Sequence, residues 1–356
     1  MPNKKKRTVA IIGSHGLYAN YGGWDQLVRN LAEKKSNEIE YLIFNSSDTK
    51  EVKILPPGVK VKRLFMKASG FQGFFYDFWS ILICYWKVDT LLLLGAQGIP
   101  LIPVLALFRN VRIVTNVGGV EWERPKFNFL IKQYLKFCFN LSFKFSDSII
   151  LDNPHYKIFA PKKSNANILV IPYGGEIDYS MDITPEIEVK YPFISDEYFL
   201  SISRSLVDNK IDELCESFSK SRFKLVLISN LSNSAYGKMV LNKYGNIENI
   251  ILIDGLYSKP ELDLVRRKCK AYIHTHTLCG TAPSLVEMMI SKRPIISVDN
   301  PQNRFTLKDK GFFYSSFSEM QNLLESKKDL SVFISSNEVC ELYSWNKIVN
   351  EYELLY

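Results

Sequence analysis

The chain has 356 residues, of which 46% are hydrophobic and 23% are charged. This balance is typical of a soluble globular protein, and the length suits two domains that each bury a core. It argues against an integral membrane protein, because no run approaches the roughly 18 apolar residues of a bilayer span.

The cysteines point to a reducing compartment. There are six, and no two have the Cys-x-x-Cys spacing of a metal or redox motif. A zinc site or a disulfide framework is therefore not expected. Residues 1–7 are basic, but the apolar run Val9–Ile12 is too short for a signal peptide. We expect a cytoplasmic protein.

Charge divides the chain into two unlike halves. Residues 1–172 carry 24 Lys and Arg against 12 Asp and Glu, whereas residues 173–356 carry 21 against 25. Only the first half is therefore expected to meet an anionic partner.

Short apolar runs alternate with amphipathic segments along the whole chain. This alternation favours an α/β fold with parallel, doubly wound sheets, whose ligands sit at the carboxyl ends of the strands. The expected strands are 8–12, 40–44, 59–65, 90–94, 111–115, 198–203, 224–229, 249–253 and 271–274, with a strand and turn over 147–154 and a strand entering a hinge over 167–175. The main expected helices are 25–33, 71–86, 126–145, 211–220, 261–270, 285–290 and 338–356.

Two loops of the first half carry candidate residues. Gly22 and Gly23 precede a helix, where paired glycines let a ligand approach the backbone, although a plain tight turn explains them equally well. Glu121 follows the strand 111–115 and could orient an acceptor hydroxyl; the alternative is a salt bridge to Arg124.

The helix 126–145 carries one cationic stripe, formed by Lys132, Lys136, Asn140 and Lys144. The stripe is either a solvated edge or a contact with anionic lipid headgroups, to which each Lys adds about 1 kcal/mol. The aromatic stretch 71–86 and the basic charge of this half favour some attraction to a membrane.

The most informative stretch is His274–Met288. A strand leads into the turn Gly280–Ser284, which opens a helix that Thr281 can cap and Pro283 can start. Such a helix end suits a diphosphate, and Glu287, about 5 Å further along, can accept hydrogen bonds from ribose hydroxyls. The stretch predicts a nucleotide-sugar site, although strand, turn and helix occur in every α/β protein.

The same stretch resembles the donor-binding motif of retaining GT-B glycosyltransferases of family four. It is most similar to a branch that contains bacterial rhamnosyltransferases, with the pattern His-x-x-Gly-Gly-Thr-Asn-Pro-Ser-Leu-Leu-Glu-Ala-Met. Cys279 replaces the first Gly of that pattern and Ala282 the Asn. The matching residues are His276, Gly280, Thr281, Pro283, Ser284, Leu285, Glu287 and Met288.

Two further segments carry the resemblance in the first half. Residues 21–25 follow the branch pattern Tyr-Gly-Gly-Phe-Glu, and residues 118–127 follow Asp-Gly-x-Glu-Trp-x-Arg-x-Lys-Trp. Gly118 replaces the Asp of the second pattern. The resemblance implies that the Gly22-Gly23 loop faces the cleft, and that Glu121, Trp122 and His276 lie on the acceptor side.

In the second half the family places an Arg, and five residues later usually a Lys, against the donor diphosphate. Arg204 matches the Arg, Asn209 fills the Lys position as in the branch, and Lys210 follows it. These cations would stabilise the departing diphosphate, although a surface Arg and a solvated Lys are the plain alternative. The resemblance thus implies catalytic roles for Arg204, Lys210 and Glu287. It implies donor contacts by Gly22, Gly23, Arg204, Asn209, Lys210, Gly280, Thr281, Ser284, Leu285 and Glu287.

The resemblance implies a GT-B fold, in which two Rossmann-like domains with parallel sheets face each other across a cleft. We expect an acceptor-side domain at 1–173, a linker at 174–192, a nucleotide-sugar domain at 193–337, and a helix at 338–356 that packs back on the first domain.

The predicted activity is that of a retaining, metal-independent hexosyltransferase. It would move a sugar, with rhamnose from dTDP-rhamnose as the best guess, to a lipid-linked glycan in capsule or O-antigen assembly. The predicted protein needs no cofactor, binds no nucleic acid and lies peripherally on the inner face of the cytoplasmic membrane. Another donor (a UDP- or GDP-sugar), a nucleotide-sugar epimerase and a non-catalytic assembly partner remain alternatives.

Overall fold

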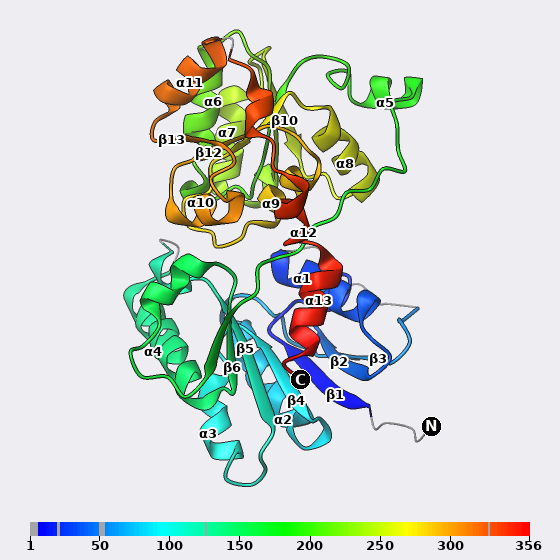
Figure 1. The fold of residues 1–356 in the computed structure, drawn as a ribbon, viewed down its shortest axis with the longest axis vertical. Helices are drawn as coiled ribbons and strands as arrows, with labels where there is room; N and C mark the ends of the chain where they lie inside the picture. The colour runs from blue at the N-terminus through cyan, green and yellow to red at the C-terminus, as the bar shows by residue number, and fades with distance from the viewer. Residues whose placement is uncertain (1–5, 20–21, 50–53, 125–126, 327) are drawn as a thin grey trace. The chain divides into compact units, whose positions relative to one another are not determined.

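A computed structural model describes residues 6–19, 22–49, 54–124, 127–326 and 328–356 (Figure 1). Tyr21 and Lys126, which belong to the two motifs of the first half, lie outside these residues. The chain forms two compact units: unit 1 is Met1–Gly174 with Trp345–Tyr356, and unit 2 is Gly175–Ser344. The segment expected as a linker, 174–192, therefore begins unit 2, and it contains the short helix α5 (Pro185–Lys190).

The described residues of unit 1 form a seven-stranded sheet in the order β3-β2-β1-β4-β5-β6-β7, with every neighbouring pair parallel. The strands are β1 (Arg7–Ile12), β2 (Ile39–Asn45), β3 (Val59–Arg63), β4 (Thr90–Leu94), β5 (Arg112–Gly118), β6 (Ser148–Leu151) and β7 (Asn167–Val170). The central strands are buried on both faces, which explains their continuous apolar runs.

Helices cover both faces of this sheet. On one face, α1 (Gly23–Lys34) and α13 (Trp345–Glu353) share a core with β1. On the other, α2 (Gly70–Cys84), α3 (Ile102–Leu105) and α4 (Phe129–Phe145) pack against β4 and β5. The parallel sheet with helices on both faces matches the predicted fold class.

The last turns of the chain bind unit 1 through specific contacts. The Asn116 amide donates to the Tyr352 hydroxyl at 2.6 Å, and the Tyr41 and Tyr356 rings meet edge to face. A Cβ at Gly174 would lie only 2.5 Å from Trp345 Cδ2, so this position has room for glycine alone.

Unit 2 contains a six-stranded parallel sheet in the order β10-β9-β8-β11-β12-β13. Its strands are β8 (Phe199–Ile202), β9 (Leu225–Ser229), β10 (Ile250–Asp254), β11 (Ala271–His274), β12 (Ile295–Val298) and β13 (Phe312–Tyr314). Its helices are α5, α6 (Ile211–Ser219), α7 (Ala235–Tyr244), α8 (Lys259–Lys268), α9 (Pro283–Ile290), α10 (Pro301–Leu307), α11 (Phe317–Glu325) and α12 (Asn337–Glu341).

Several helix ends differ from the sequence-based expectation, and two of the differences have a clear structural cause. The single helix expected over 338–356 is two helices, α12 and α13, separated at residues 342–344, where the chain passes from unit 2 to unit 1. Helix α4 begins at Phe129 rather than 126, because the Asn128 side chain accepts from the Ile131 amide and caps it there. No helix in the described part of the chain has the length and hydropathy needed to cross a bilayer.

Candidate functional site

The sheet of unit 2 reverses its strand order between β8 and β11. From β8 the chain builds β9 and β10 on one side, and it then returns to add β11 on the other side. Ligands of doubly wound sheets bind beyond the carboxyl ends of the strands at such a reversal. The loop after β8 contains Arg204–Lys210 and the loop after β11 contains Gly280–Ser284, so both predicted donor segments lie at this one edge.

Hydrogen bonds fold the loop after β8 back on itself. The Asn209 side chain donates to the Arg204 carbonyl oxygen at 2.8 Å, and the Leu206 amide donates to the same oxygen. Lys210 ends the loop in the left-handed region, with φ 50°, and α6 follows directly. Asn209 is buried and stabilises the loop through this bond, while the Arg204 side chain is exposed.

Two threonines join the loop after β8 to the loop after β11. Thr275 Oγ1 donates to the Asn209 carbonyl oxygen at 2.5 Å, and Thr277 Oγ1 donates to the Asp208 carbonyl oxygen at 2.8 Å. The two loops are thus one hydrogen-bonded unit. The Arg204 and Lys210 side chains make no hydrogen bond or ion pair with any described residue, which leaves both cations available to an anion.

The turn before α9 presents the start of a helix at the same edge. Pro283 occupies the first helical position, as expected. Thr281, however, is not the N-cap. If it were, the helix would begin at residue 282, but it begins at Pro283. Ala282 holds the N-cap position and has no side chain that can cap the helix. Pro283 has no N–H, and the Leu285 amide donates to the Ala282 carbonyl oxygen at 3.0 Å, so the first turn offers the Ser284 amide to an anion. Leu285 is fully buried and anchors α9 in the core of unit 2.

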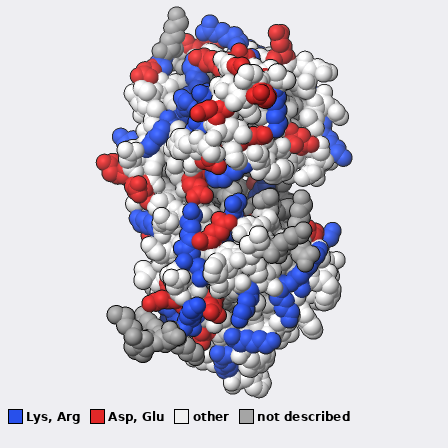
Figure 2. Space-filling view, turned by 90° about the vertical axis from the view of Figure 1, so that its right-hand side faces the viewer, with Lys and Arg blue, Asp and Glu red and all other residues white. Residues whose placement is uncertain are grey.

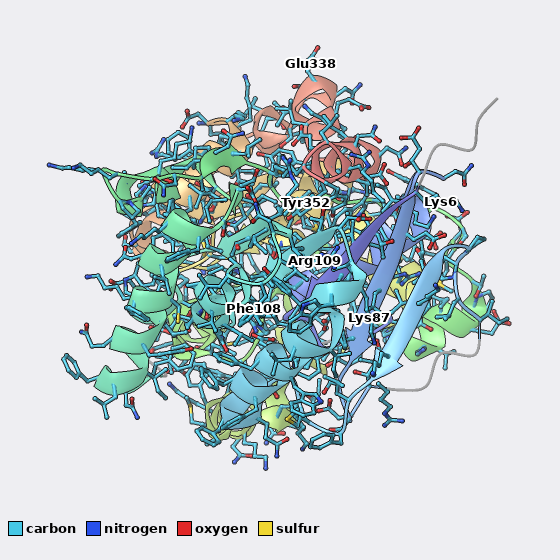
Figure 3. All side chains as sticks on the ribbon, turned by 90° about the horizontal axis from the view of Figure 1, so that it is seen from below. Lys6, Lys87, Phe108, Arg109, Glu338 and Tyr352 are labelled. Atoms are coloured by element: carbon cyan, nitrogen blue, oxygen red, sulfur yellow. The ribbon has the colours of Figure 1, made fainter. Side chains whose placement is uncertain are left out.

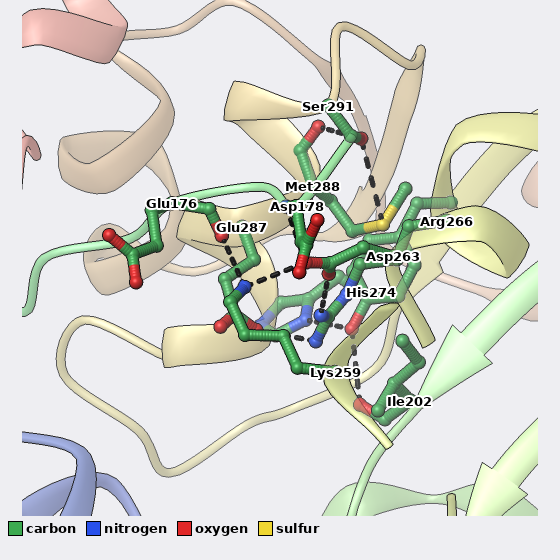
Figure 4. Close-up of polar contacts among 11 residues, drawn as sticks. Glu176, Asp178, Ile202, Lys259, Asp263, Arg266, His274, Glu287, Met288 and Ser291 are labelled. Carbon is green, nitrogen blue, oxygen red and sulfur yellow. Dashed lines mark hydrogen bonds and ion pairs between the residues drawn. The ribbon is translucent and has the colours of Figure 1, made fainter. Parts of the chain in front are cut away.

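Glu287 lies one turn into α9 and belongs to a buried chain of charges (Figure 4). Arg266 of α8 donates to Glu287 Oε2 and, through Nη1, to Asp263 Oδ1 at 2.6 Å. Asp263 is itself fully buried, and its other oxygen accepts from Lys259 Nζ at 2.6 Å. Lys259 also donates to the Glu176 carbonyl oxygen at 2.8 Å, so the chain of contacts begins where unit 2 begins.

One oxygen of the Glu287 carboxylate stays open. Oε1 accepts no hydrogen bond from a described residue, and 10% of the side chain is exposed. Burial raises the pKa of Glu287 above its ordinary value, while the Arg266 guanidinium and Lys259 act in the opposite direction. The arrangement is that of a fixed carboxylate which can accept one further hydroxyl hydrogen.

The two histidines around the end of β11 stack on each other, with ring centroids 4.4 Å apart. His274 is fully buried, and burial together with the neighbouring His276 lowers its pKa well below the ordinary value, so it is neutral at pH 7. His276 is half-buried and belongs to unit 2; its carbonyl oxygen accepts from Asn300 and Asn303, which hold this loop against the start of α10. No three His, Cys, Asp or Glu side chains among the described residues are placed to hold a metal ion.

The candidates of unit 1 lie at the carboxyl edge of its own sheet. Gly22 is the N-cap of α1 and has open space where a Cβ would stand, and Gly23 begins the helix. The sequence analysis gave Trp24 no role of its own. Its ring lies 3.2 Å from a Cβ position at Gly95 and 3.3 Å from one at Gly118, at the ends of β4 and β5.

In the second motif of unit 1, residues 118–127, several side chains contact other parts of the same unit. Glu121 forms a 3.0 Å ion pair with Arg124, which is the plain alternative considered above. Trp122 is buried and packs edge to face against Phe139 of α4 at 4.5 Å, so its ring contributes to the core of unit 1. Gly118 has φ 62°, a conformation that favours glycine and accounts for its presence in place of the Asp of the motif.

No protein-family model matches the chain, and neither does any curated protein sequence. Solved structures do match over nearly the whole chain. Sucrose-phosphate synthase from Thermosynechococcus elongatus has a TM-score of 0.80 at 13% identity, covering 99% of this chain and 98% of that one. HepE from Anabaena, in complex with UDP-glucose, has a TM-score of 0.72 at 11% identity, covering 98% and 99%. The α,α-trehalose 6-phosphate synthase from Burkholderia multivorans has a TM-score of 0.70 at 9% identity, covering 99% and 98%.

The chain has the GT-B fold. Units 1 and 2 are its two Rossmann-like domains, as predicted. Arg266, Thr275 and Thr277 were not predicted from the sequence; they position the candidate donor residues through contacts between elements. The only local signal for Arg266 was its spacing of three residues from Asp263, which places both charges on one face of α8.

Proposed function

We propose that the chain is a glycosyltransferase that binds a nucleotide-sugar donor on unit 2. The observation that carries this proposal is the meeting of two segments at the reversal between β8 and β11. One segment offers exposed cations, and the other offers an uncapped helix start followed by a fixed carboxylate. The likeness in fold to HepE, which was solved with UDP-glucose, supports the same class of donor.

Each group has a distinct role in this proposal. Arg204 and Lys210 bind the diphosphate, together with the amides at Gly280, Thr281 and Ser284, because charge-assisted bonds to phosphate are strong and directional. Glu287 accepts a hydrogen bond from a ribose hydroxyl through Oε1, the oxygen that Arg266 does not contact. Asn209 and Leu285 position the two segments rather than touch the donor.

The reaction breaks the bond between the anomeric carbon and the diphosphate oxygen. Negative charge develops on the departing diphosphate, and the cations and helix dipole at this edge stabilise it without a metal ion. The acceptor hydroxyl oxygen bonds to the anomeric carbon on the face from which the diphosphate leaves, and its proton passes to the departing diphosphate oxygen, so that the anomeric configuration is retained. Unit 1 supplies the acceptor side, with Gly22, Gly23 and Glu121 as candidates there, while His276 of unit 2 is a further candidate.

Two nucleotide sugars are candidates for the donor, and one class of molecule is proposed for the acceptor. The resemblance of residues 274–288 favours dTDP-rhamnose, whereas HepE was solved with UDP-glucose. The two nucleotides differ at the 2′-hydroxyl, which dTDP lacks, and at the 5-methyl group of the base, which UDP lacks. The acceptor we propose is a lipid-linked glycan of surface polysaccharide assembly at the inner face of the cytoplasmic membrane.

Donor binding is tested by thermal unfolding in the presence of UDP-glucose, dTDP-rhamnose and GDP-mannose. A ligand at 100 times its Kd should add about 2.7 kcal/mol to the free energy of unfolding. The proposal predicts stabilisation by one nucleotide sugar, and loss of this effect when Arg204 is replaced by Ala. If no nucleotide sugar stabilises the protein, the proposed function is wrong.

Turnover separates the alternatives. A glycosyltransferase releases nucleoside diphosphate faster when an acceptor glycan is added. An epimerase would act on the nucleotide sugar without an acceptor, and a non-catalytic assembly partner would bind it without releasing product.

A further inference from the structure

Helix α2 exposes a stripe of large apolar side chains where a surface helix normally carries polar ones. The exposed residues recur at intervals of three or four and therefore lie on one face. They are Phe71 (83% exposed), Phe75 (48%), Trp79 (48%) and Leu82 (39%) of α2, with Trp86 (52%) of the short 3₁₀ helix Tyr85–Lys87 that follows it, and we call them the aromatic face. Every exposed residue from 71 to 86 except Gln72 belongs to it.

This helix carries almost no charge. Between Lys67 and Lys87 the only Asp, Glu, Lys or Arg is Asp77. Asp77 is buried on the opposite side, and burial alone raises the pKa of its carboxyl to about 8, so that it is mostly protonated at pH 7. The aromatic face is therefore apolar, uncharged and bounded at both ends by lysine.

Neighbouring elements extend the apolar surface. Leu107 and Phe108, just after α3, are largely exposed. The next residue, Arg109, donates to the carbonyl oxygens of Tyr85 and Val88, and the Tyr85 hydroxyl donates back to the Arg109 carbonyl oxygen. These bonds fix the segment against the end of α2, and Figure 3 shows Phe108, Arg109 and Lys87 close together.

Helix α4 lies beside α2, with the rings of Phe74 and Tyr134 5.3 Å apart. It exposes four further apolar residues: Phe129, Leu130, Ile131 and Phe137. Residues 124–146 contain no Asp or Glu, while Lys136 and Lys144 are exposed on this helix. Figure 2, which views another side, shows basic and acidic side chains mixed over the surface.

We propose that α2 docks unit 1 onto a lipid bilayer with anionic headgroups, lying in the plane of the surface with its aromatic face at the boundary between headgroups and acyl chains. Two observations favour a bilayer over a protein partner. Tryptophan and phenylalanine beside lysine are the residues of an interfacial helix. The described residues 68–88 and 127–146 also expose no acidic side chain, which complements an anionic membrane, whereas the rim of a protein interface is polar.

The docking surface extends the proposed function, because it would bring unit 1 to a lipid-linked acceptor. In this one respect it rests on the proposed function. The surface itself depends only on residues of unit 1. Vesicle binding and donor binding can therefore fail independently. A failure of vesicle binding would refute the docking surface, and a failure of donor binding would refute the proposed function.

The experiment uses the full chain and sedimentation with vesicles of phosphatidylcholine mixed with phosphatidylglycerol, compared with phosphatidylcholine alone. Trp79 and Trp86 are the two exposed tryptophans of the five in the chain, and they serve as reporters. Binding to the mixed vesicles should shift tryptophan emission to the blue, and bromine-labelled lipid should quench it. Phosphatidylcholine alone should bind more weakly.

Replacing Trp79 and Trp86 together by Ser should reduce partition to the mixed vesicles at least tenfold. The matched control is Phe305→Ser, which removes a similarly exposed aromatic side chain from unit 2 and should leave partition unchanged. Stabilisation by the nucleotide sugar should be the same in both variants, which shows that they fold.

Three results would overturn the proposal. The first is no binding to either vesicle, and the second is equal binding by the double variant. The third is a concentration-dependent dimer that the double variant abolishes, since that would make a second copy the occupant of the aromatic face.

Discussion

Replacing Glu287 by Gln should weaken the binding of UDP about 10- to 100-fold. A hydrogen bond to a charged group contributes about 1.5–3 kcal/mol, and about 1.4 kcal/mol is a factor of ten. Arg266 can only donate, so the amide oxygen of the new Gln would turn toward it. An NH₂ group would then stand at the position of Oε1, the proposed acceptor of the ribose hydroxyl.

The variant should still fold. Removing one partner of a buried ion pair is costly when it leaves a charge alone, at about 3–5 kcal/mol. Here Arg266 keeps the Asp263 carboxylate at 2.6 Å, so the loss of stability should fall below that range. Thermal unfolding without ligand measures it.

Calorimetric titration with UDP is the assay, and Glu261→Gln is the matched control. Glu261 lies on α8 and pairs with Lys190 and Tyr191, which are not donor candidates. A 2′,3′-dideoxy nucleotide completes the comparison, since it should bind the wild type and Glu287→Gln equally. Equal weakening of UDP and the dideoxy nucleotide by Glu287→Gln, or no weakening of either, would refute a hydrogen bond to the ribose.

Three other expectations follow from particular side chains. Arg204→Ala and Lys210→Ala should each weaken UDP about tenfold or more but leave uridine unaffected, as measured by the same titration, because only the diphosphate interacts with these cations. The raised pKa of Asp77, from 3.8 to about 8, means that the folded protein holds this proton more tightly than the unfolded chain. The contribution of Asp77 to the free energy of unfolding should therefore be fully present below about pH 4 and should fall, by at most about 5 kcal/mol, as the pH rises to 8. Thermal unfolding should show a flatter pH dependence for Asp77→Asn than for the wild type. Parallel pH dependences of the two proteins would contradict the raised pKa of Asp77. Gly174→Ala would force a Cβ within 2.5 Å of Trp345 and should cost about 1–3 kcal/mol in chemical unfolding, whereas Gly22→Ala meets open space and should change stability by less than about 0.5 kcal/mol.

The architecture was predictable because both sheets are parallel and buried. Strands covered on both faces read as continuous apolar runs, as β4 and β9 do, and the segments between them read as helices. The helix ends were less predictable. Ala282 rather than Thr281 holds the N-cap of α9, and the helix that begins there buries Leu285 and Val286 in the core of unit 2.

The candidate site was predictable only where its chemistry is local. Residues 280–287 contain the loop, the start of α9 and the carboxylate within eight consecutive positions, so their spacing is visible in the sequence. The partners of these residues come from other elements: Thr275 and Thr277 bind carbonyl oxygens of the loop after β8, more than sixty residues earlier. Backbone carbonyl acceptors leave no trace in a sequence, and such contacts require the fold.

Arg266 explains how a carboxylate can be kept at this buried position. Two cations, Lys259 and Arg266, and two carboxylates, Asp263 and Glu287, alternate along one chain of contacts, so that each buried charge has an opposite neighbour. Without that balance burial would favour the protonated form of Glu287, whose hydroxyl could not accept from a ribose in the same way. Three members of the chain lie on α8 and one on α9. The packing of these two helices therefore places the charges around Glu287, and in the proposed donor site a change at their contact should lower donor affinity more than it lowers the stability of the fold.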